Sequence, residues 1–365
     1  MASTQPVLLR PEHDELRTSV RKFLADTSPE SAVRAVMETA TGYDPDVWRR
    51  ACDELGLAAL IVPEQYGGGG YSFVEIGVVL EESGRVLWPS PLFATAVLAT
   101  TAILSSQDLK AAADYLPPIA AGTLRATVAT SRALVATRTN GTWQVTGTSS
   151  YVIDGHTAEL VLVFAETEAG LSLFAVNGDA AGLTREAQST MDLTRKLAAV
   201  RLEATPARLV GTEGAGADLL ERVLAAAAVA LAAEQVGGAQ RLLELTVDYV
   251  KDRKQFGRAI GSFQAVKHRC ADMLVDVETA RAVMVHALWS VATDSDELAE
   301  DAATAKVFCS DAYLSCAGAA IQLHGGIGFT WEHSAHLFFK RAKTSQLIFG
   351  HPVHHRRHLG DLLDL

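Results

Sequence analysis

The chain has 365 residues and a formal net charge of −11 at pH 7, with 48% hydrophobic and 21% charged residues. The length predicts two or three domains, and the composition is that of a globular protein rather than a disordered chain or a coiled coil. A membrane-spanning helix needs about 18 consecutive uncharged apolar residues, and the sequence has no run of that length. No signal peptide is recognisable either. The acidic balance argues against nucleic-acid binding. We therefore expect a cytoplasmic protein that binds neither nucleic acid nor membrane.

The first predicted domain, residues 1–120, is helical. Its apolar residues recur at helical spacing, and two of the segments begin just after a proline. The four glycines of Gly67–Gly70 lack the Lys-Ser/Thr pair that follows them in a P-loop, so we interpret them as a flexible turn. The predicted helices are Glu12–Asp26, Asp46–Leu60, Val74–Leu87 and Leu92–Leu104.

The second predicted domain, residues 121–212, changes to β-rich segments. Asn140-Gly141 is a strong signal for a hairpin turn, because both residues tolerate positive φ. We therefore expect a small, β-barrel-like domain. Its predicted strands include Thr142–Val145, Leu160–Phe164, Leu171–Val176 and Ala198–Leu202.

The third predicted domain, residues 213–365, is helical again and is long enough for a four-helix bundle. Strands and helices do not alternate, so the fold class is α+β multidomain and a Rossmann site is not supported. Four cysteines without paired spacing are interpreted as buried free thiols of a reducing compartment. The predicted helices are Leu219–Ala233, Val236–Arg253, Phe263–Thr293, Leu298–Leu323 and a segment around Ser334–Ser345.

Two motifs in the third domain carry the chemistry of binding. Asp252–Arg258 places three cations, an aromatic ring and a glycine at the end of a long helix, which suits a phosphate. Its alternative interpretation is a solvated helix terminus whose cations answer the helix dipole. Gln322–Phe329 contains three glycines that let backbone approach a ligand closely. Its alternative is a helix C-cap followed by a turn.

Together these motifs resemble those of the acyl-CoA dehydrogenases. Arg253–Gly257, followed by Phe263–His268, resembles the helical signature of that family, and Gln322–Phe329 resembles its glycine motif. Trp48–Gly70 resembles its first domain, so the resemblance covers nearly the whole chain. It implies an all-α domain, a β domain and a four-helix bundle. It also implies flavin adenine dinucleotide (FAD) and the α,β-dehydrogenation of an acyl-CoA thioester.

In that family one chain surrounds the flavin ring, and its neighbour holds the pyrophosphate and adenosine. The resemblance places this chain in the second role. The implied cofactor-binding residues are Arg253, Gln255, Phe256, Gly257, Ile260, Phe263, Val266, Gln322, Leu323, Gly325 and Gly326.

The features of the first role are missing from this chain. The two positions that can carry the catalytic base are occupied by Phe349 and Ala227, which cannot take a proton. Ile153 stands where the family has a Thr that hydrogen-bonds near the reactive flavin nitrogen. The β-domain segment Ala126–Ser131 continues into Arg132–Val135 without the Pro-Gly-Ser pattern that covers the flavin. We therefore expect no catalytic residue in this chain.

Histidines near the C-terminus offer two further hypotheses. His354 and His358 have the i, i+4 spacing of zinc ligands on a helix, but Arg356-Arg357 would repel a cation. We therefore expect no metal site. His351, two residues after Phe349, is a candidate for a displaced base.

These observations favour a subunit of a heteromeric FAD-dependent acyl-CoA dehydrogenase that is inactive by itself. A homologous partner would carry the catalytic Glu and bind most of the acyl-CoA, in an α2β2 heterotetramer with one flavin per pair. The Ala-rich helix and Gly84–Leu92 resemble the actinobacterial branch that acts on steroid side-chain CoA thioesters, as in cholesterol catabolism. An electron-transfer acceptor would reoxidise the flavin. The alternatives are a homo-oligomeric flavoenzyme that uses His351, and a flavin-free scaffold.

Overall fold

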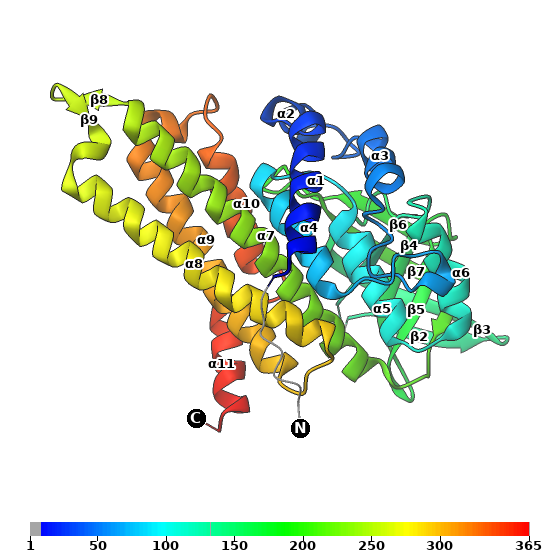
Figure 1. The fold of residues 1–365 in the computed structure, drawn as a ribbon. Coiled ribbons are helices and arrows are strands. Elements are labelled where there is room, and N and C mark those ends of the chain that lie inside the picture. Colours follow the sequence, from blue (N-terminus) through cyan, green and yellow to red (C-terminus); the bar gives the residue numbers. More distant parts are fainter. Residues whose placement is uncertain (1–8, 132, 365) are drawn as a thin grey trace. The chain divides into compact units, whose positions relative to one another are not determined.

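The computed structural model describes residues 9–131 and 133–364. The chain forms two compact units. The bundle unit consists of Met1–Val33, Phe73–Trp88 and Ala228–Leu365, and the barrel unit consists of Arg34–Ser72 and Pro89–Ala227. The predicted order of helices, strands and helices is confirmed (Figure 1). The predicted domain boundaries at residues 120 and 212 stay a prediction, because the two compact units are each made of separate chain segments and do not follow those boundaries.

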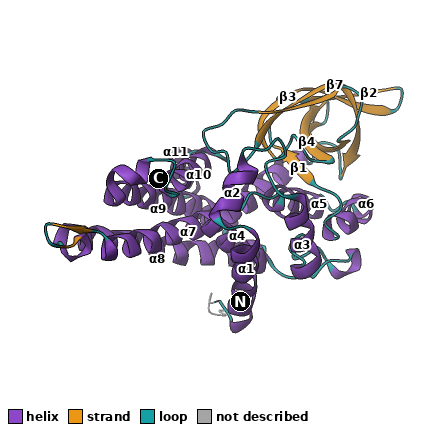
Figure 2. Cartoon of the chain, turned by 90° about the horizontal axis from the view of Figure 1, so that it is seen from above, coloured by secondary structure: helices purple, strands orange, loops and turns teal. Residues whose placement is uncertain are grey.

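The bundle unit is built around long helices, and α9 packs against α8, α10 and α11. A short hairpin of β8 and β9 connects α7 to α8 at one end (Figure 2). Two helices, α2 and α7, contribute residues to both units. The helices are α1 (Pro11–Thr27), α2 (Glu30–Met37), α4 (Phe73–Val86), α7 (Gly216–Asp252), α8 (Gln264–Ala292), α9 (Leu298–His324), α10 (Ala335–Leu347) and α11 (Pro352–Leu362).

The helix α7 is continuous for 37 residues, which corrects the prediction of two helices. The two glycines at positions 237 and 238 do not break it. A Cβ on Gly237 would lie 1.8 Å from the carbonyl oxygen of Glu81, and one on Gly84 would lie 2.0 Å from that of Glu234. The glycines therefore allow the backbones of α4 and α7 to touch, and tertiary packing outweighs the low helix propensity of glycine.

The barrel unit combines short helical segments with the main sheet. Asp44 caps α3 (Pro45–Leu55), accepting hydrogen bonds from the amides of Asp46 and Val47 at 2.9 and 3.2 Å, and Gly56 ends it at φ 61°. The segment Asp46–Leu60 is therefore helical only to Leu55. The other helices are α5 (Thr100–Ser105) and α6 (Leu109–Ala120), with a π-helical turn at Phe93–Ala99.

That π-helical turn differs from the regular helix predicted over Leu92–Leu104. Thr95 and Thr100 are both fully buried, so their hydroxyl groups need partners inside the protein. The hydroxyl of Thr100 donates to the carbonyl of Thr95 at 3.0 Å, and the hydroxyl of Thr95 bonds to Ala126. Side-chain hydrogen bonds to the backbone thus accompany the wider turn.

The glycine loop Gly67–Gly70 does not cradle a phosphate. The amides of all four glycines donate to backbone carbonyls within Ala59–Glu64, at 2.9 to 3.3 Å. No amide is left for an anion, as predicted. The loop is a hydrogen-bonded turn, as its composition suggested, and its flexibility stays a prediction.

The main sheet closes on itself. Its strand order is β1-β4-β2-β3-β7-β5, β5 also pairs with β4, and β6 pairs with β7. The barrel-like domain is therefore confirmed (Figure 2). The strands are β1 (Ala126–Ala129), β2 (Val135–Thr139), β3 (Thr142–Ile153), β4 (Leu160–Thr167), β5 (Gly170–Asn177), β6 (Leu183–Ala187) and β7 (Leu197–Val210).

The predicted hairpin is present between β2 and β3. Asn140 and Gly141 both have positive φ, 52° and 82°, as a two-residue turn that matches strand twist requires. The barrel interior is apolar, with Val145, Val163 and Phe174 fully buried. In the segment Ala126–Val135, Arg132 lies outside the described residues.

The cysteines agree with the prediction in part. All four are free, and Cys52, Cys309 and Cys316 are buried, whereas Cys270 is half-buried. Across the described ranges, no helix is long and apolar enough to cross a membrane.

Candidate functional site

The first motif forms a hairpin at the end of α7. Strand β8 (Lys254–Gln255) pairs with β9 (Arg258–Ala259), and Phe256 and Gly257 form the turn at φ 51° and 79°. The amide of Ile260 donates to the carbonyl of Arg253 at 2.8 Å. The sequence forms this turn because a glycine sits where the second residue needs positive φ.

The turn leaves an aromatic ring in solvent. Phe256 is 91% exposed, with its ring 6.2 Å from that of Phe263 in an edge-to-face arrangement. The guanidinium of Arg258 lies over the ring of Phe263 at 4.0 Å. Exposure of a whole phenylalanine side chain is costly, so this ring is suited to contact with a ligand or partner.

The second motif lies at the same end of the bundle. Its residue His324 stacks on Tyr249 with ring centroids 4.4 Å apart, and the Tyr249 hydroxyl donates to the carbonyl of His324 at 3.3 Å. Tyr249 precedes Arg253 by one helical turn, and His324 precedes Gly325 directly. This stacked pair therefore joins the end of α7 to the end of α9. Figure 1 shows the β8–β9 hairpin at the same end of α7.

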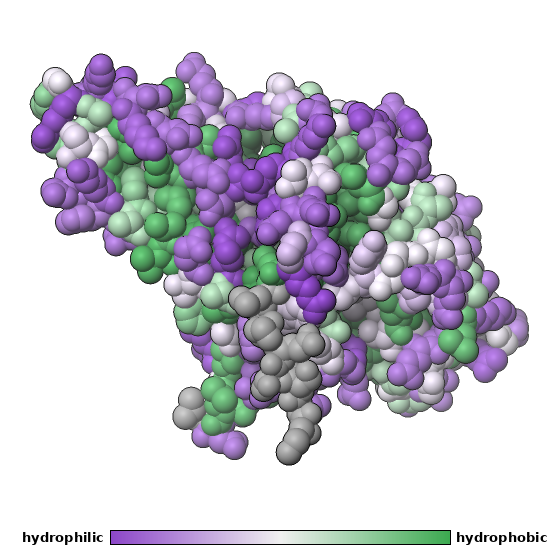
Figure 3. Space-filling view, in the orientation of Figure 1, coloured by the Kyte–Doolittle hydropathy of each residue, from purple (hydrophilic) through white to green (hydrophobic). Residues whose placement is uncertain are grey.

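Cations and open space dominate this end of the bundle. Arg253, Lys254 and Arg258 are exposed, and none of them forms an ion pair within the part of the chain described. A Cβ added to Gly257, Gly325 or Gly326 would meet nothing within 4 Å. Figure 3 shows mainly hydrophilic residues at this tip, with apolar ones between them. The arrangement leaves donors available for an anion.

The remaining predicted cofactor residues flank this tip. Gln322 is exposed, and Leu323, Ile260, Phe263 and Val266 are half-buried. Val266 lines a cavity of about 360 Å³ between α7 and α8. Sequence reasoning missed the other residues of that cavity, although Lys267 lies inside a quoted motif. They are Val247, Val250, Lys251, Ala259, Gly261, Lys267 and Cys270.

The turn after α10 contains Phe349, the first of the two positions at which the resemblance places the catalytic base. Helix α10 starts beside the glycine motif and runs for 13 residues, so about 20 Å of helix separates the two ends. Phe349 is half-buried at φ 58°, and its carbonyl accepts a hydrogen bond from His355 Nε2 at 2.9 Å. Burial lowers the pKa of His355, which favours the neutral ring. This turn therefore presents an apolar side chain, and the hydrogen bond from His355 braces its backbone.

A buried lysine holds the last turn of α10. Lys306 is fully buried, and its Nζ donates to the carbonyls of Ser345 at 2.5 Å and Gln346 at 3.2 Å. It also bonds to the hydroxyl of Ser310 at 3.3 Å. Burial lowers the pKa of Lys306 to about 7. The lysine supplies donors to carbonyls that have no partner inside the helix, as at any helix C-terminus.

Two further positions that the resemblance singled out, Ala227 and Ile153, belong to the barrel unit. Ala227 is completely buried within α7, and Ile153 is 3% exposed at the end of β3. The hydroxyl of Thr127 donates to the carbonyl of Ile153 at 2.6 Å. Neither side chain offers a proton acceptor.

The histidines near the C-terminus are engaged or scattered. His351 is the N-cap of α11, and its Nδ1 accepts the amide of Val353 at 3.3 Å. In the neutral ring this bond engages Nδ1 and places the proton on Nε2. His354 and His358 are exposed. No group of three metal-ligating side chains occurs among the described residues.

Comparison with known proteins identifies the family. The model of the acyl-CoA dehydrogenase N-terminal domain matches residues 10–123, and that of the C-terminal domain matches residues 214–361. The acyl-CoA dehydrogenase IpdE2 of Mycolicibacterium smegmatis is 40% identical over 349 residues, covering 95% of this chain and 97% of its own length. IpdE2 of Mycobacterium tuberculosis is 37% identical, covering 93% and 94%.

Solved structures agree over nearly the full chain. A variant of the Tcur3481-Tcur3483 steroid ACAD has a TM-score of 0.89 at 31% identity, covering 97% of this chain and 98% of its own. The ChsE4-ChsE5 complex of Mycobacterium tuberculosis has a TM-score of 0.92 at 27% identity, covering 99% of both chains. From its sequence and its fold, this chain belongs to the acyl-CoA dehydrogenase family.

Proposed function

We propose that this chain is the non-catalytic subunit of a heteromeric acyl-CoA dehydrogenase. It would hold the pyrophosphate and adenosine of an FAD that is shared with a homologous partner. The observation that carries the proposal is the contrast within the chain. The donors at the tip of the bundle are intact, whereas Phe349, Ala227 and Ile153 have no acid–base or hydrogen-bonding side chain.

The residues at the tip fit the chemistry of the cofactor. Arg253 offers a planar guanidinium to a phosphate, and the amides of Gln255 and Gln322 can donate or accept. The exposed ring of Phe256 offers an apolar face to the adenosine. The open space at Gly325 and Gly326 lets backbone approach the pyrophosphate. Bound flavin would accept the hydride that leaves the β carbon of the substrate.

The partner must supply the proton acceptor. Dehydrogenation removes the α proton, and general-base catalysis needs a carboxylate or similar group within hydrogen-bond reach of it. The cap that His351 forms on α11 argues against its use as a displaced base. We therefore assign the catalytic Glu and most of the acyl-CoA site to the partner.

The substrate class and the assembly rest on the relatives. One similar structure is called a steroid ACAD, and another is the complex of two differently named chains. By analogy we propose a bulky steroid side-chain CoA thioester as substrate and an α2β2 heterotetramer with one flavin per pair. An electron-transfer acceptor would reoxidise that flavin.

Exposed apolar side chains on the bundle support a partner. Leu274 and Val275 on α8 are 49% and 64% exposed, and Phe308 on α9 is 47% exposed. Green residues lie on the bundle beside the β8–β9 tip in Figure 3. Exposed apolar groups of this size are typical of a surface that is covered in an assembly.

The flavin-to-chain ratio tests this function. We would measure flavin absorbance per chain for the protein expressed alone and after co-purification with the product of the neighbouring gene. The proposal expects little flavin or poor solubility alone, and one flavin per two chains in the complex. One flavin per chain in an active, yellow homo-oligomer would contradict it. A complex that contains no flavin would also contradict the proposal and would favour the alternative of a flavin-free scaffold.

A further inference from the structure

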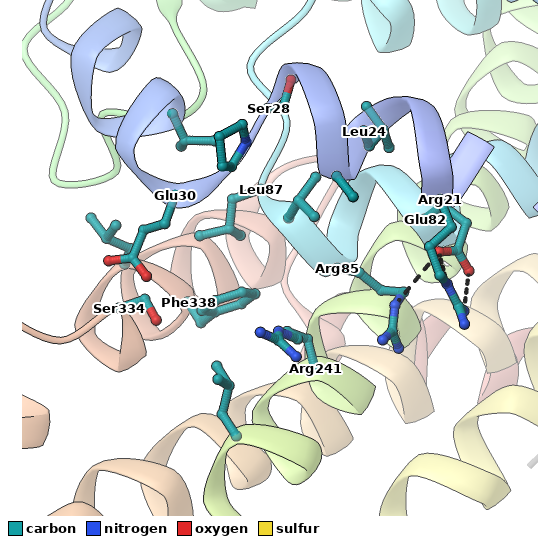
Figure 4. Close-up of a pocket in the computed structure, with 16 residues that line it drawn as sticks. Arg21, Leu24, Ser28, Glu30, Glu82, Arg85, Leu87, Arg241, Ser334 and Phe338 are labelled. Atoms are coloured by element: carbon teal, nitrogen blue, oxygen red, sulfur yellow. Dashed lines mark hydrogen bonds and ion pairs between the residues drawn. The ribbon is translucent and has the colours of Figure 1, made fainter. Parts of the chain in front are cut away.

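A second cavity, of about 380 Å³, lies inside the bundle unit (Figure 4). This volume falls in the lower part of the roughly 300–1,000 Å³ range of ligand pockets. The cavity shares no residue with the predicted flavin site. Helices α1, α2, α4, α7 and α10 contribute its walls, which are largely apolar: Leu24, Val33, Leu87, Leu245, Leu337 and Phe338.

Two carboxylates beside the cavity are already neutralised. Arg21 binds Glu82 through Nε at 2.8 Å and Nη2 at 2.7 Å. Arg85 binds Glu244 through both terminal nitrogens, at 3.0 and 2.7 Å. Each is a two-pronged guanidinium–carboxylate pair, the geometry in which this interaction is strongest. These two arginines are therefore committed to the protein's own acidic groups.

Arg241 is left with a weaker partner. Its Nη1 lies 3.6 Å from Glu244, beyond hydrogen-bond distance, and Glu244 is held by Arg85. Figure 4 shows its guanidinium extending toward Phe338, whereas Arg21 and Arg85 turn toward Glu82. Its side chain is 41% exposed. The cavity therefore has one cation that is available to an anion.

Two hydroxyl groups add hydrogen-bonding capacity. Ser28 and Ser334 line the cavity and are 4% and 7% exposed. Neither hydroxyl has a hydrogen-bond partner among the residues that the structure describes. Neither oxygen is among the buried unpaired atoms of the described residues, so both can bond to water or to a polar ligand atom.

The exposed carboxylate of Glu30 restricts the charge of the ligand. It lies beside Ser334 in Figure 4 and would repel a multiply charged anion. Apolar walls likewise favour an apolar body over a small, strongly hydrated ion. We propose that this cavity binds a compact apolar monocarboxylate, with its carboxylate on Arg241 and its body against Leu87, Leu245 and Phe338.

Calorimetric titration of the full chain, in its complex where one forms, tests this site. The probe is cyclohexanecarboxylate, and cyclohexanemethanol is its uncharged match. We expect the acid to bind at least roughly tenfold more tightly than the alcohol, as a charge-assisted bond implies. Arg241→Gln should remove that preference, and Arg241→Lys should restore part of it. Arg49→Gln, on an exposed arginine of α3, should change nothing.

A variant that fills the cavity gives an independent test. Leu245→Trp should abolish binding of the acid while the complex keeps its flavin content, which separates this site from the proposed flavin function. Equal binding of acid and alcohol would overturn the carboxylate assignment. Unchanged binding to Arg241→Gln would overturn it too. Competition by inorganic phosphate at millimolar concentration would contradict the preference for an apolar monoanion.

Discussion

The tip of the bundle and the turn after α10 belong to the same unit, yet they are built in opposite ways. At the tip, Phe256 and the neighbouring cations are exposed, and the cations have no ion-pair partner within the described ranges. At the turn, Phe349 is half-buried, and hydrogen bonds from His355 and Lys306 brace the surrounding backbone. The exposed groups of the tip are therefore available to an external ligand, whereas the groups at the turn mainly stabilise the local fold.

If this chain is the proposed non-catalytic subunit, the difference indicates how it could lack the base without a cost to its fold. Replacing a catalytic carboxylate by an apolar side chain removes a charge that must otherwise be solvated or paired. The backbone hydrogen bonds at the turn do not depend on the side chain at position 349. The exposed polar groups at the tip contribute little to folding, and their binding role stays a prediction.

The largest expected effect separates the two chains of the proposed complex. Replacing the partner's catalytic Glu by Gln should lower turnover by about 10²–10⁴, the usual contribution of a general base. Phe349→Ala and His351→Ala in this chain should leave turnover within a few-fold of wild type. Steady-state kinetics of the reconstituted complexes measures this. A large loss in His351→Ala would show that the turn is catalytic after all.

The next effect concerns the tip. Arg253→Ala should weaken flavin retention and lower the melting temperature of the complex, because a charge-assisted bond to phosphate contributes roughly 1.5–3 kcal/mol. Arg253→Lys should recover part, since the planar fork is lost. Flavin content after gel filtration is the measurement, with Arg49→Ala as the matched control. If Arg253→Ala kept the flavin content of the wild type, the alternative interpretation of these cations as a solvated helix terminus would be favoured.

A smaller effect tests the brace beneath the turn. The pKa of Lys306 is lowered to about 7 in the folded chain and is about 10.4 when unfolded. The unfolded chain therefore binds more protons between these values, so the free energy of unfolding rises with pH there. From pH 7 to 8.5 the rise should be about 1.6 kcal/mol.

Lys306→Met should lack that rise in denaturant titrations. Burial raises the pKa of Cys52, Cys309 and Cys316 to about 12, which gives the opposite slope above about pH 8.5. Cys52 and Cys316 contribute equally in both proteins, whereas the charge of Lys306 acts on Cys309, so the slopes are compared below about pH 8.5. Identical slopes for the two proteins would mean that Lys306 does not change protonation on folding.

The smallest expected effect is the hardest test of the comparison. Phe349→Glu restores a carboxylate at the aligned base position, but Ile153 and the altered β-domain segment remain. We expect no change in turnover per complex, since a base without a positioned flavin and substrate has nothing to act on. A doubling of turnover would show that the second site is otherwise intact.

The sequence alone determined the features that depend on neighbouring residues. Helical periodicity, prolines at helix starts and the Asn140-Gly141 turn are local, so the order of helices, barrel and bundle followed from them. The resemblance in Arg253–Gly257 and Gln322–Phe329 identified the family, which the comparisons bear out. The roles of those residues stay predictions.

Only the tertiary structure decided features that depend on distant partners. The sequence predicts two helices, Leu219–Ala233 and Val236–Arg253, yet α7 is continuous, and Gly237 leaves room for the backbone of α4 to pack against it. Lys306 is buried where it meets the terminal carbonyls of α10, and nothing in its sequence neighbourhood indicates this. Arg241 differs from Arg21 and Arg85 because the carboxylate nearest to it, that of Glu244, is already hydrogen-bonded to Arg85. Contacts across such sequence separations leave no periodic trace in the chain, because they arise when the helices pack.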